Sequence, residues 1–367
     1  MSDLTITRLL TKKDDLGRTE PQTNVESSAA ADGEALLRIK SFSITTNNIT
    51  YAAFGDAMNY WRFFPTSRPG WGQMPVWGFA EVVASSVAGV EVGELFYGYY
   101  PIASHIRMAP ERVTSRGFYD GAEHRRALTS AYNQYTRCDA DPAYKRELEN
   151  YQALFRPLFI TSFMLADFLS DNHFFGAKEL LISSASSKTA YGAAFCLTDE
   201  ANVKLVGLTS SGNQAFVRGL GCYAETALYQ DIEKRAVAAP TLYVDFSGDE
   251  DLRARIHHHL GSALKYDCYA GSAANIHFFE DKGLPGPAPA FYFAPIQIKK
   301  RNADWGPEIV NQRFNEAQMK FFTHVSRAEN PWVRIAEGDG FDAARQVIAT
   351  IARSGGDPAI GHIIRLG

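Results

Sequence analysis

Small hydroxyl residues and one lysine form the segment from Ser184 to Gly192 (SASSKTAYG), between an apolar run and a helix-forming run. Backbone N–H groups at a helix start, hydroxyls and an ammonium all bind phosphate. Ser and Thr also cap helices without any ligand, because their side-chain oxygens accept from first-turn N–H groups. The segment is therefore a candidate phosphate-binding turn, with a plain capped helix as the alternative. Its candidate contacts are Ser186, Ser187, Lys188 and Thr189.

Tyrosine and tryptophan are concentrated in the first 135 residues, and a basic cluster follows near residue 300. These two aromatic side chains combine flat apolar area with a polar group, which suits an aromatic or phenolic ligand. The alternative for each is packing in the core of a β-rich domain. The candidates for substrate binding are Trp61, Tyr97, Tyr132, Tyr135, Lys300 and Arg301.

Two tyrosines and one histidine are candidates for acid–base chemistry, namely Tyr51, Tyr60 and His105. A Tyr hydroxyl beside a Lys or Arg side chain has a favoured phenolate and can then act as a general acid or base. His105 fits a hydrogen-bonding role in the core equally well.

Neither the cysteines nor the histidines form a metal-binding pattern. The four cysteines are dispersed without a C-x-x-C spacing, which predicts reduced thiols. The run His257-His258-His259 lies on a predicted helix, where consecutive side chains point to different faces. We therefore expect solvated histidines rather than ligands, and no metal site.

Charge and hydropathy exclude two classes of partner. The net charge is -4 and no run of Lys and Arg is present to neutralise several phosphates, so no nucleic acid is expected. The apolar stretch from Leu154 to Leu169 is interrupted by Arg156, Pro157 and Asp167, and falls short of the ~20 apolar residues that a membrane span needs. The charged N-terminus has no apolar leader segment. A cytoplasmic protein without a membrane partner is predicted.

The elements that must position these residues fall into two groups. A chain of 367 residues exceeds the size of one core, so two domains are expected. Short strand-like runs occupy residues 34–110 and predict a β-barrel or sandwich, whereas residues 111–150 are charged and helix-permissive. Strands then alternate with helices, which predicts a parallel sheet. The predicted strands are Glu179 to Ser184, Val203 to Leu208, Thr241 to Phe246 and Leu264 to Ala270.

This order of parts, together with several short blocks, resembles the medium-chain dehydrogenase/reductase superfamily in its quinone-oxidoreductase and enoyl-reductase branch. PVWGFA at 75–80 is similar to their Pro-x-x-Gly-His-Glu block, and GVEVGE at 89–94 to their Gly-x-x-x-Gly-Asp turn. IGHIIRL at 360–366 is similar to their closing strand. The aromatic motifs WRFFP at 61–65 and YGYYP at 97–101 resemble those of a side family of this superfamily known as a domain of unknown function.

The resemblance implies an α/β fold with a GroES-like β-domain and a Rossmann domain with a doubly wound parallel sheet. The expected parts are a polar N-terminal segment at 1–33, the GroES-like domain with a helical insertion at 34–157, the Rossmann domain at 158–295 and a return to the first domain at 296–367. TNNITY at 46–51 corresponds to a turn near the nicotinamide, which implies Asn48 as a cofactor contact and Tyr51 as the best catalytic candidate.

The resemblance also bears on metal and cofactor. Zinc-dependent relatives carry ligands where this chain has Asn47, Phe79 and Ala80, so no catalytic zinc is expected. An acidic residue about 20 residues beyond the phosphate turn would hydrogen-bond the ribose of NAD. The chain has Thr209, Ser210 and Asn213 there, so NADP is preferred over NAD.

Three hypotheses of function follow. The first is an NADPH-dependent reductase of an activated alkene, quinone or carbonyl compound, with an aromatic small-molecule substrate and Tyr51 or another Tyr as proton donor. The second is a redox-neutral lyase or isomerase acting on a phenolic aromatic compound through Tyr, His and Lys side chains. It is favoured because the corresponding turn of the superfamily is rich in glycine, whereas Ser, Lys and Thr replace most of those glycines in this chain. The third is a non-catalytic binding protein. The sequence also leaves open whether the protein forms a homodimer.

Overall fold

The computed structural model describes residues 3–200, 202–271 and 283–367 and divides into two compact units. Unit 1 comprises Met1–Leu154 and Val333–Gly367, and unit 2 comprises Phe155–Trp332. The return to the first unit therefore begins near residue 333 rather than at 296. The intervening helices, residues 294–325, belong to unit 2 because their aromatic side chains pack on other helices of that unit.

Unit 1 is built from two sheets, one of three strands in the order β2-β1-β4 and one of nine strands. The larger sheet runs β17-β18-β3-β5-β6-β10-β9-β8, and β7 pairs with β3. The strands of unit 1 are β1 (Asp3–Lys12), β2 (Asp15–Ser27), β3 (Ala35–Ile44), β4 (Trp71–Gly72), β5 (Pro75–Ser85), β6 (Leu95–Pro101), β7 (His105–Met108), β8 (Pro110–Thr114), β9 (Gly117–Asp120), β10 (Gln134–Arg137), β17 (Arg334–Asp339) and β18 (Ile360–Arg365). Its helices are α1 (Thr46–Ala53) and α8 (Gly340–Ser354), with 3-10 turns η1 (Tyr60–Arg62), η2 (Glu123–Arg125), η3 (Ser130–Tyr132), η4 (Cys138–Ala140) and η5 (Arg146–Leu148).

The core of unit 1 is formed by apolar residues of its strands. Leu37, Ile39 and Phe42 of β3 are fully buried together with Val76 and Ala80 of β5. Burial of this kind stabilises a domain by about 25 cal/mol per Å² of apolar surface removed from water.

Two parts of unit 1 differ from the prediction. Residues 3–27 form the β1-β2 hairpin, in which the two strands pair along nearly their whole length. Residues 111–150 contain three strands and short 3-10 turns in place of a helical insertion. The reason lies in Arg125, which is 1% exposed and hydrogen-bonds Asp120, Asn133 and Tyr135. Arg125, which lies in a segment predicted to be a charged helix, is thus the buried centre of a folded loop.

Unit 2 contains one sheet of six parallel strands in the order β13-β12-β11-β14-β15-β16. The strands are β11 (Glu179–Ile182), β12 (Lys204–Thr209), β13 (Glu225–Leu228), β14 (Thr241–Asp245), β15 (Leu264–Tyr269) and β16 (Ala290–Phe291). Numbered from the first strand of the unit, the order is 3-2-1-4-5-6, which is the order of a doubly wound dinucleotide-binding sheet. The four predicted strands lie within one or two residues of β11, β12, β14 and β15.

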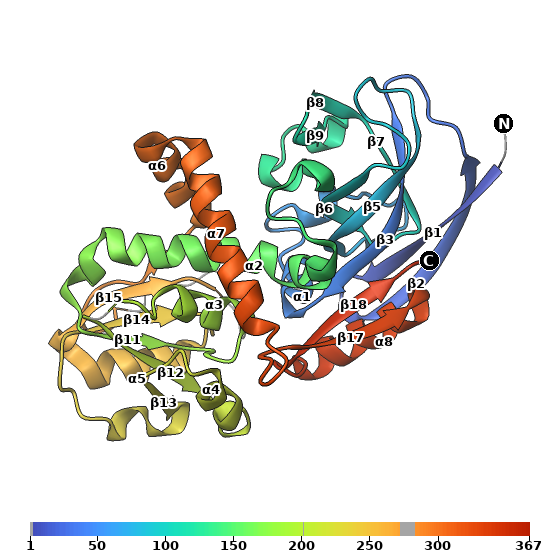
Figure 1. Ribbon diagram of the computed structural model, residues 1–367. Helices are drawn as coiled ribbons and strands as arrows, with labels where there is room; N and C mark the ends of the chain where they lie inside the picture. Colours follow the sequence, from blue (N-terminus) through green and yellow to red (C-terminus); the bar gives the residue numbers. More distant parts are fainter. Residues whose placement is uncertain (1–2, 201, 272–282) are drawn as a thin grey trace. The chain divides into compact units, whose positions relative to one another are not determined.

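Helices cover both faces of this sheet, with α2 on one face and α5 on the other (Figure 1). Leu252, Ile256 and Leu260 of α5 pack against sheet residues such as Val206 and Tyr243. The helices are α2 (Glu149–Asp171, which begins in unit 1), α3 (Lys188–Cys196), α4 (Gln214–Leu220), α5 (Glu250–Leu260), α6 (Ala294–Trp305) and α7 (Pro307–Val325). The 3-10 turns are η6 (His173–Gly176), η7 (Ser211–Asn213), η8 (Tyr229–Lys234) and η9 (Gly261–Ala263).

Among the described residues, one helical stretch, Arg146–Asp171, is long and apolar enough to cross a membrane by length and composition. More than half of its most apolar window is buried in the protein, 56%. Phe155 and Phe159 pack on Phe321 of α7, and Leu165 is fully buried. These contacts place the helix in the packed core of the protein.

Candidate functional site

The turn between β11 and α3 lies at the carboxyl end of the central strand of unit 2. Ser184 opens it with φ 47°, the left-handed region that favours glycine. Its N–H donates to the Tyr229 hydroxyl at 2.9 Å, and its carbonyl accepts from the Ser187 N–H at 2.7 Å. A serine in this conformation carries backbone strain of about 1 to 3 kcal/mol. Strain of this kind is often found at binding sites.

Helix α3 begins directly after this turn. Ser187 is its N-cap, and the Ser187 hydroxyl accepts from the Ala190 N–H at 3.3 Å. Lys188 and Thr189 occupy the first helical turn, whose backbone N–H groups carry the positive end of the helix dipole. Capping is thus present, as the alternative interpretation requires, but it occupies one hydroxyl of the predicted set.

The structure brings several of the predicted cofactor contacts to one edge of the sheet. The Asn213 amide donates to the Ser186 hydroxyl at 3.2 Å, which joins the end of the β12 loop to the phosphate turn. Thr209 is the buried last residue of β12, and Ser210 after it is exposed. The Ala185 N–H donates to the Leu208 carbonyl at 3.1 Å and holds the turn on this strand. The hydroxyls after β12 and those before α3 therefore lie on the same rim.

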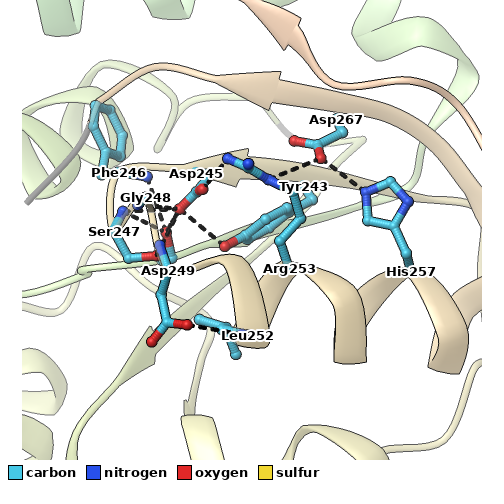
Figure 2. Close-up of polar contacts among 11 residues, drawn as sticks. Tyr243, Asp245, Phe246, Ser247, Gly248, Asp249, Leu252, Arg253, His257 and Asp267 are labelled. Atoms are coloured by element: carbon cyan, nitrogen blue, oxygen red, sulfur yellow. Dashed lines mark hydrogen bonds and ion pairs between the residues drawn. The ribbon is translucent and has the colours of Figure 1, made fainter. Parts of the chain in front are cut away.

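A second set of polar residues lies at the end of β14, the strand on the other side of β11. The Asp245 side chain is fully buried, and its Oδ1 atom accepts from the Ser183, Tyr243 and Ser247 hydroxyls at 2.7, 3.0 and 2.7 Å. The same atom accepts from the backbone N–H groups of Ser247 and Gly248 at 2.8 and 3.1 Å. Figure 2 shows this convergence on one carboxylate. Asp245 thereby holds the ends of β11 and β14 at the point where the strand order reverses, which is where ligands bind in such sheets.

The other oxygen of Asp245 belongs to a buried charge network. Arg253 of α5 is 1% exposed and forms ion pairs with Asp245 and with Asp267 of β15, the second at 3.3 Å (Figure 2). His257 is also fully buried, with Nε2 at 2.8 Å from Asp267 and Nδ1 at 2.9 Å from the Pro285 carbonyl. Burial raises the pKa of Asp267, while the His257 hydrogen bond and the Arg253 charge act to lower it.

The sequence did not reveal this network, and for one member the prediction was wrong. His257 was expected on the surface, but it is buried because it lies on the face of α5 that packs against β15. His258 is exposed, as expected, and His259 bonds the Arg235 carbonyl. The sequence did contain one signal of this network. Asp245 ends a buried strand, and Ser247-Gly248-Asp249, a helix-capping pattern, begins two residues later.

Unit 1 brings together three of the predicted aromatic residues with two others. The ring of Tyr51 lies 4.8 Å from Tyr60, 5.6 Å from Tyr99 and 6.1 Å from Tyr132, between ring centroids. The Trp77 Nε1 atom donates to the Tyr51 hydroxyl at 3.3 Å, and the hydroxyls of Tyr60 and Tyr132 are 3.3 Å apart. We call these five residues, Tyr51, Tyr60, Trp77, Tyr99 and Tyr132, the phenol cluster.

The phenol cluster holds neutral phenols. Burial raises the pKa of Tyr51 to about 12, and burial also raises the pKa of Tyr60, and those of Tyr99 and Tyr132 well above the ordinary value. Arg125 lies over the rings of Phe63 and Phe64 beside the cluster, but its charge is paired with Asp120 at 2.7 Å. These tyrosines are therefore proton and hydrogen-bond donors at neutral pH rather than bases.

These pKa shifts predict an alkaline limit of stability. Because Tyr51 holds its proton more tightly in the folded state, its contribution is fully present below pH 10 and is lost as the pH rises through about 12. We expect tyrosinate absorbance to appear together with the loss of the near-ultraviolet circular dichroism signal in a pH titration. Ionisation of the cluster at ordinary tyrosine pKa values in a protein with an intact signal would contradict this burial.

The other residues of unit 1 that were predicted to bind substrate are packed against neighbouring side chains or backbone. Trp61 is 6% exposed and fills the space left by Gly55 and Gly72, where an added Cβ would lie 2.1 and 2.3 Å from its ring atoms. Tyr135 is fully buried and donates to the Tyr99 carbonyl at 2.6 Å. Tyr97 stacks on Trp77 with ring centroids 5.6 Å apart. Their roles toward a substrate stay predictions.

Lys300 and Arg301 lie on α6 of unit 2, whereas the phenol cluster belongs to unit 1. Arg301 is 9% exposed, bonds Asp167 and Asp171 of α2 at 2.6 and 3.0 Å, and lies over the Trp305 ring at 4.4 Å. Lys300 pairs with Asp171 at 3.0 Å and with Asp304 at 2.7 Å. These contacts tie α6 to α2, and binding of substrate here stays a prediction.

His105 and Asn48 also have structural partners. His105 is half-buried on β7 with its Nδ1 atom 3.2 Å from the Ser104 hydroxyl, and burial and the Arg38 charge lower its pKa. Asn48 is buried, accepts from the Thr45 N–H at 2.7 Å and donates to the Pro75 carbonyl at 2.9 Å, which anchors α1. The backbone N–H of its neighbour Asn47 donates to the Thr45 hydroxyl at 3.2 Å.

Within residues 3–200, 202–271 and 283–367, no group of three or more His, Cys, Asp or Glu side chains is arranged to hold a metal ion. The buried Asp245, Asp267 and His257 side chains are engaged with Arg253 and with backbone groups.

Comparison with known proteins places this arrangement in a family. The model of the family described as protein of unknown function DUF2855 matches residues 42–356. The chain belongs to the DUF2855 family. A comparison with curated protein sequences finds no match.

The DUF2855 protein is similar in structure to medium-chain reductases. It matches CurA in complex with NADPH from Vibrio vulnificus with a TM-score of 0.60 at 12% identity, over 98% of this chain and 99% of that one. It matches a mutant enoyl thioester reductase from Candida tropicalis with a TM-score of 0.56 at 11% identity, over 99% and 100%. A putative NADPH:quinone reductase from Bacillus thuringiensis gives 0.53 at 11%, over 99% and 100%. The DUF2855 chain thus has the fold of these reductases, and the predicted fold of a GroES-like domain with a Rossmann domain is confirmed.

Proposed function

We propose that this DUF2855 protein is an NADPH-dependent reductase of an activated alkene, a quinone or a carbonyl compound, with an aromatic substrate. The observation that carries the proposal is the parallel sheet of unit 2, in which the hydroxyl-rich turn ends the central strand. The names of structurally similar proteins support it, since CurA was solved with NADPH and the yhdH oxidoreductase from Salmonella enterica with NADP.

The residues at the sheet edge fit a phosphorylated dinucleotide. The left-handed backbone of Ser184 provides the sharp turn that glycine usually provides, and α3 presents its N-terminus behind it. The residues from Thr209 to Asn213 include no carboxylate that would repel a 2′-phosphate. Ser186, Ser187, Lys188 and Thr189 would hold the pyrophosphate, and Thr209, Ser210 and Asn213 the ribose side. When bound, the nicotinamide supplies a hydride.

The phenol cluster supplies the groups that a reduction needs on the substrate side. A neutral Tyr hydroxyl donates a hydrogen bond to a substrate carbonyl, which favours negative charge on that oxygen. The same O–H bond can break to protonate the substrate, after which the phenolate recovers a proton from solvent. The redox-neutral alternative gains no support from these tyrosines, because burial opposes the phenolate form that a tyrosine base would need. A cytoplasmic location and assembly as a homodimer stay predictions.

Nucleotide titration tests the cofactor preference. We expect NADPH to bind at least about tenfold more tightly than NADH, the effect of one charge-assisted contact to the 2′-phosphate. The measurement is enhancement of nicotinamide fluorescence, with a thermal shift as a second readout. Tighter binding of NADH would refute the preference, and binding of neither nucleotide would remove the basis of the reductase proposal.

A further inference from the structure

Unit 1 contains a cavity that the sites described above do not use. It has a volume of about 400 Å³ and is lined by residues of β8, β9, η3 and the loops between β9 and β10. None of the five residues of the phenol cluster is among them. Pockets that bind small molecules have volumes of about 300 to 1,000 Å³, so the cavity is large enough for a small organic ligand.

The charges around the cavity leave one guanidinium without a carboxylate. The carboxylates of the lining are both paired, Glu111 with Arg126 at 2.9 Å and Asp120 with the buried Arg125 at 2.7 Å. Arg112 also lines the cavity, and it forms no ion pair with any residue that the structure describes. The cavity therefore has one positive charge to offer to a ligand.

The backbone at Arg112 is a β-bulge. Glu111 of β8 lies opposite Tyr119 of β9, and Thr114 lies opposite Gly117, so β8 has one residue more than β9 between these pairs. Arg112 has φ 52°, the left-handed conformation that such a bulge usually gives to glycine. A residue with a Cβ is strained there, and strained residues of this kind are found at ligand-binding sites. The backbone alone would therefore favour a residue other than arginine at this position.

The rest of the lining combines apolar surface with a few polar groups. The centroid of the Tyr119 ring lies 5.7 Å from the Arg112 guanidinium, and Leu128 is partly buried against the core of unit 1. Ser130 adds a hydroxyl. Glu111 stands in the same lining, and its carboxylate opposes a ligand with several negative charges. These groups fit a ligand with one negative charge and a flat apolar body.

We propose that this cavity binds an aromatic monocarboxylic acid, whose carboxylate accepts two parallel hydrogen bonds from the Arg112 guanidinium. The planar fork of a guanidinium matches the two oxygens of a carboxylate. The ring of the acid contacts Tyr119 and Leu128. The proposal goes beyond the reductase function and does not depend on it, because the lining residues all belong to unit 1 and the proposed NADPH contacts to unit 2.

The probe is benzoate, titrated into the full chain without nucleotide and followed by calorimetry. Arg112→Asn should weaken benzoate binding roughly ten- to hundredfold, the effect of losing a charge-assisted contact. Asparagine adopts the left-handed conformation more readily than arginine, so this variant should unfold at the same or a higher urea concentration. Arg112→Lys keeps the charge without the planar fork, and should retain part of the affinity that Arg112→Asn loses.

Arg62→Asn is the matched control, because Arg62 is an exposed arginine of η1 in the same unit and does not line the cavity. It should leave benzoate affinity unchanged. Acetate, which has the carboxylate but no ring, should bind the wild type about two- to tenfold more weakly than benzoate. Inorganic phosphate should also bind more weakly.

Four results would overturn the proposal. The first is equal benzoate affinity of the wild type and Arg112→Asn, and the second is binding of acetate or phosphate as tight as that of benzoate. The third is an equal loss of affinity in Arg62→Asn. The fourth is a loss of binding in Arg112→Asn and Arg112→Lys that is accompanied by lower stability of both, which would make Arg112 a structural residue. Since no nucleotide is present, a failure of NADPH binding or hydride transfer leaves these results unaffected.

Discussion

Replacing Arg253 with Met should lower the free energy of unfolding of unit 2 by about 3 to 5 kcal/mol, the cost of removing one partner of a buried ion pair. The guanidinium lies between Asp245 and Asp267, all three side chains being 0 or 1% exposed. Without it, both carboxylates remain in the core and lose the guanidinium that pairs with them, while Asp267 keeps its hydrogen bond to His257. The methionine fills most of the volume, so the loss reports charge rather than a cavity.

Arg255→Met is the matched control, since it lies on the same helix and pairs with Glu233 at the surface. An exposed pair contributes little to stability, so this variant should resemble the wild type in urea unfolding. Equal stability of the two variants would show that Asp245 and Asp267 do not need the charge. Asp245 also accepts from the backbone N–H groups of Ser247 and Gly248, so Arg253→Met should in addition weaken NADPH binding.

Lys188→Ala should weaken NADPH binding roughly ten- to hundredfold, because a charge-assisted contact contributes about 1.5 to 3 kcal/mol. The lysine lies in the first turn of α3, directly after the Ser187 cap. Stability should change little, since a cation at a helix N-terminus opposes the helix dipole. The measurements are NADPH affinity and urea unfolding of the same variant.

Lys265→Ala, an exposed lysine of β15 in the same unit, serves as the control for a general loss of positive charge. It should leave NADPH affinity unchanged. Unchanged affinity combined with lower stability in Lys188→Ala would make the lysine a structural residue, and the turn a capped helix without a phosphate ligand.

Local patterns were enough to predict the strands of unit 2. Buried parallel strands are continuous apolar runs, and the turns after them carry hydroxyls, so β11, β12, β14 and β15 could be located within one or two residues. The short edge strands β13 and β16 were missed because their residues are partly exposed and carry little apolar pattern. The joining of Ser186 with Asn213 follows from the same logic, since carboxyl ends of parallel strands share one edge.

The sequence by itself thus determined the fold, the place of the hydroxyl-rich turn after β11 and the concentration of tyrosine in the first part of the chain. Only the tertiary structure decided which charges are buried and which phenols meet. Arg125 and Arg253 are both buried in ion networks, and their carboxylate partners Asp120, Asp245 and Asp267 lie on strands. Likewise Tyr51, Trp77 and Tyr132 lie on α1, β5 and η3, and the packing of these three segments sets their distances. A contact between segments far apart in the sequence depends on that packing, which no local pattern encodes.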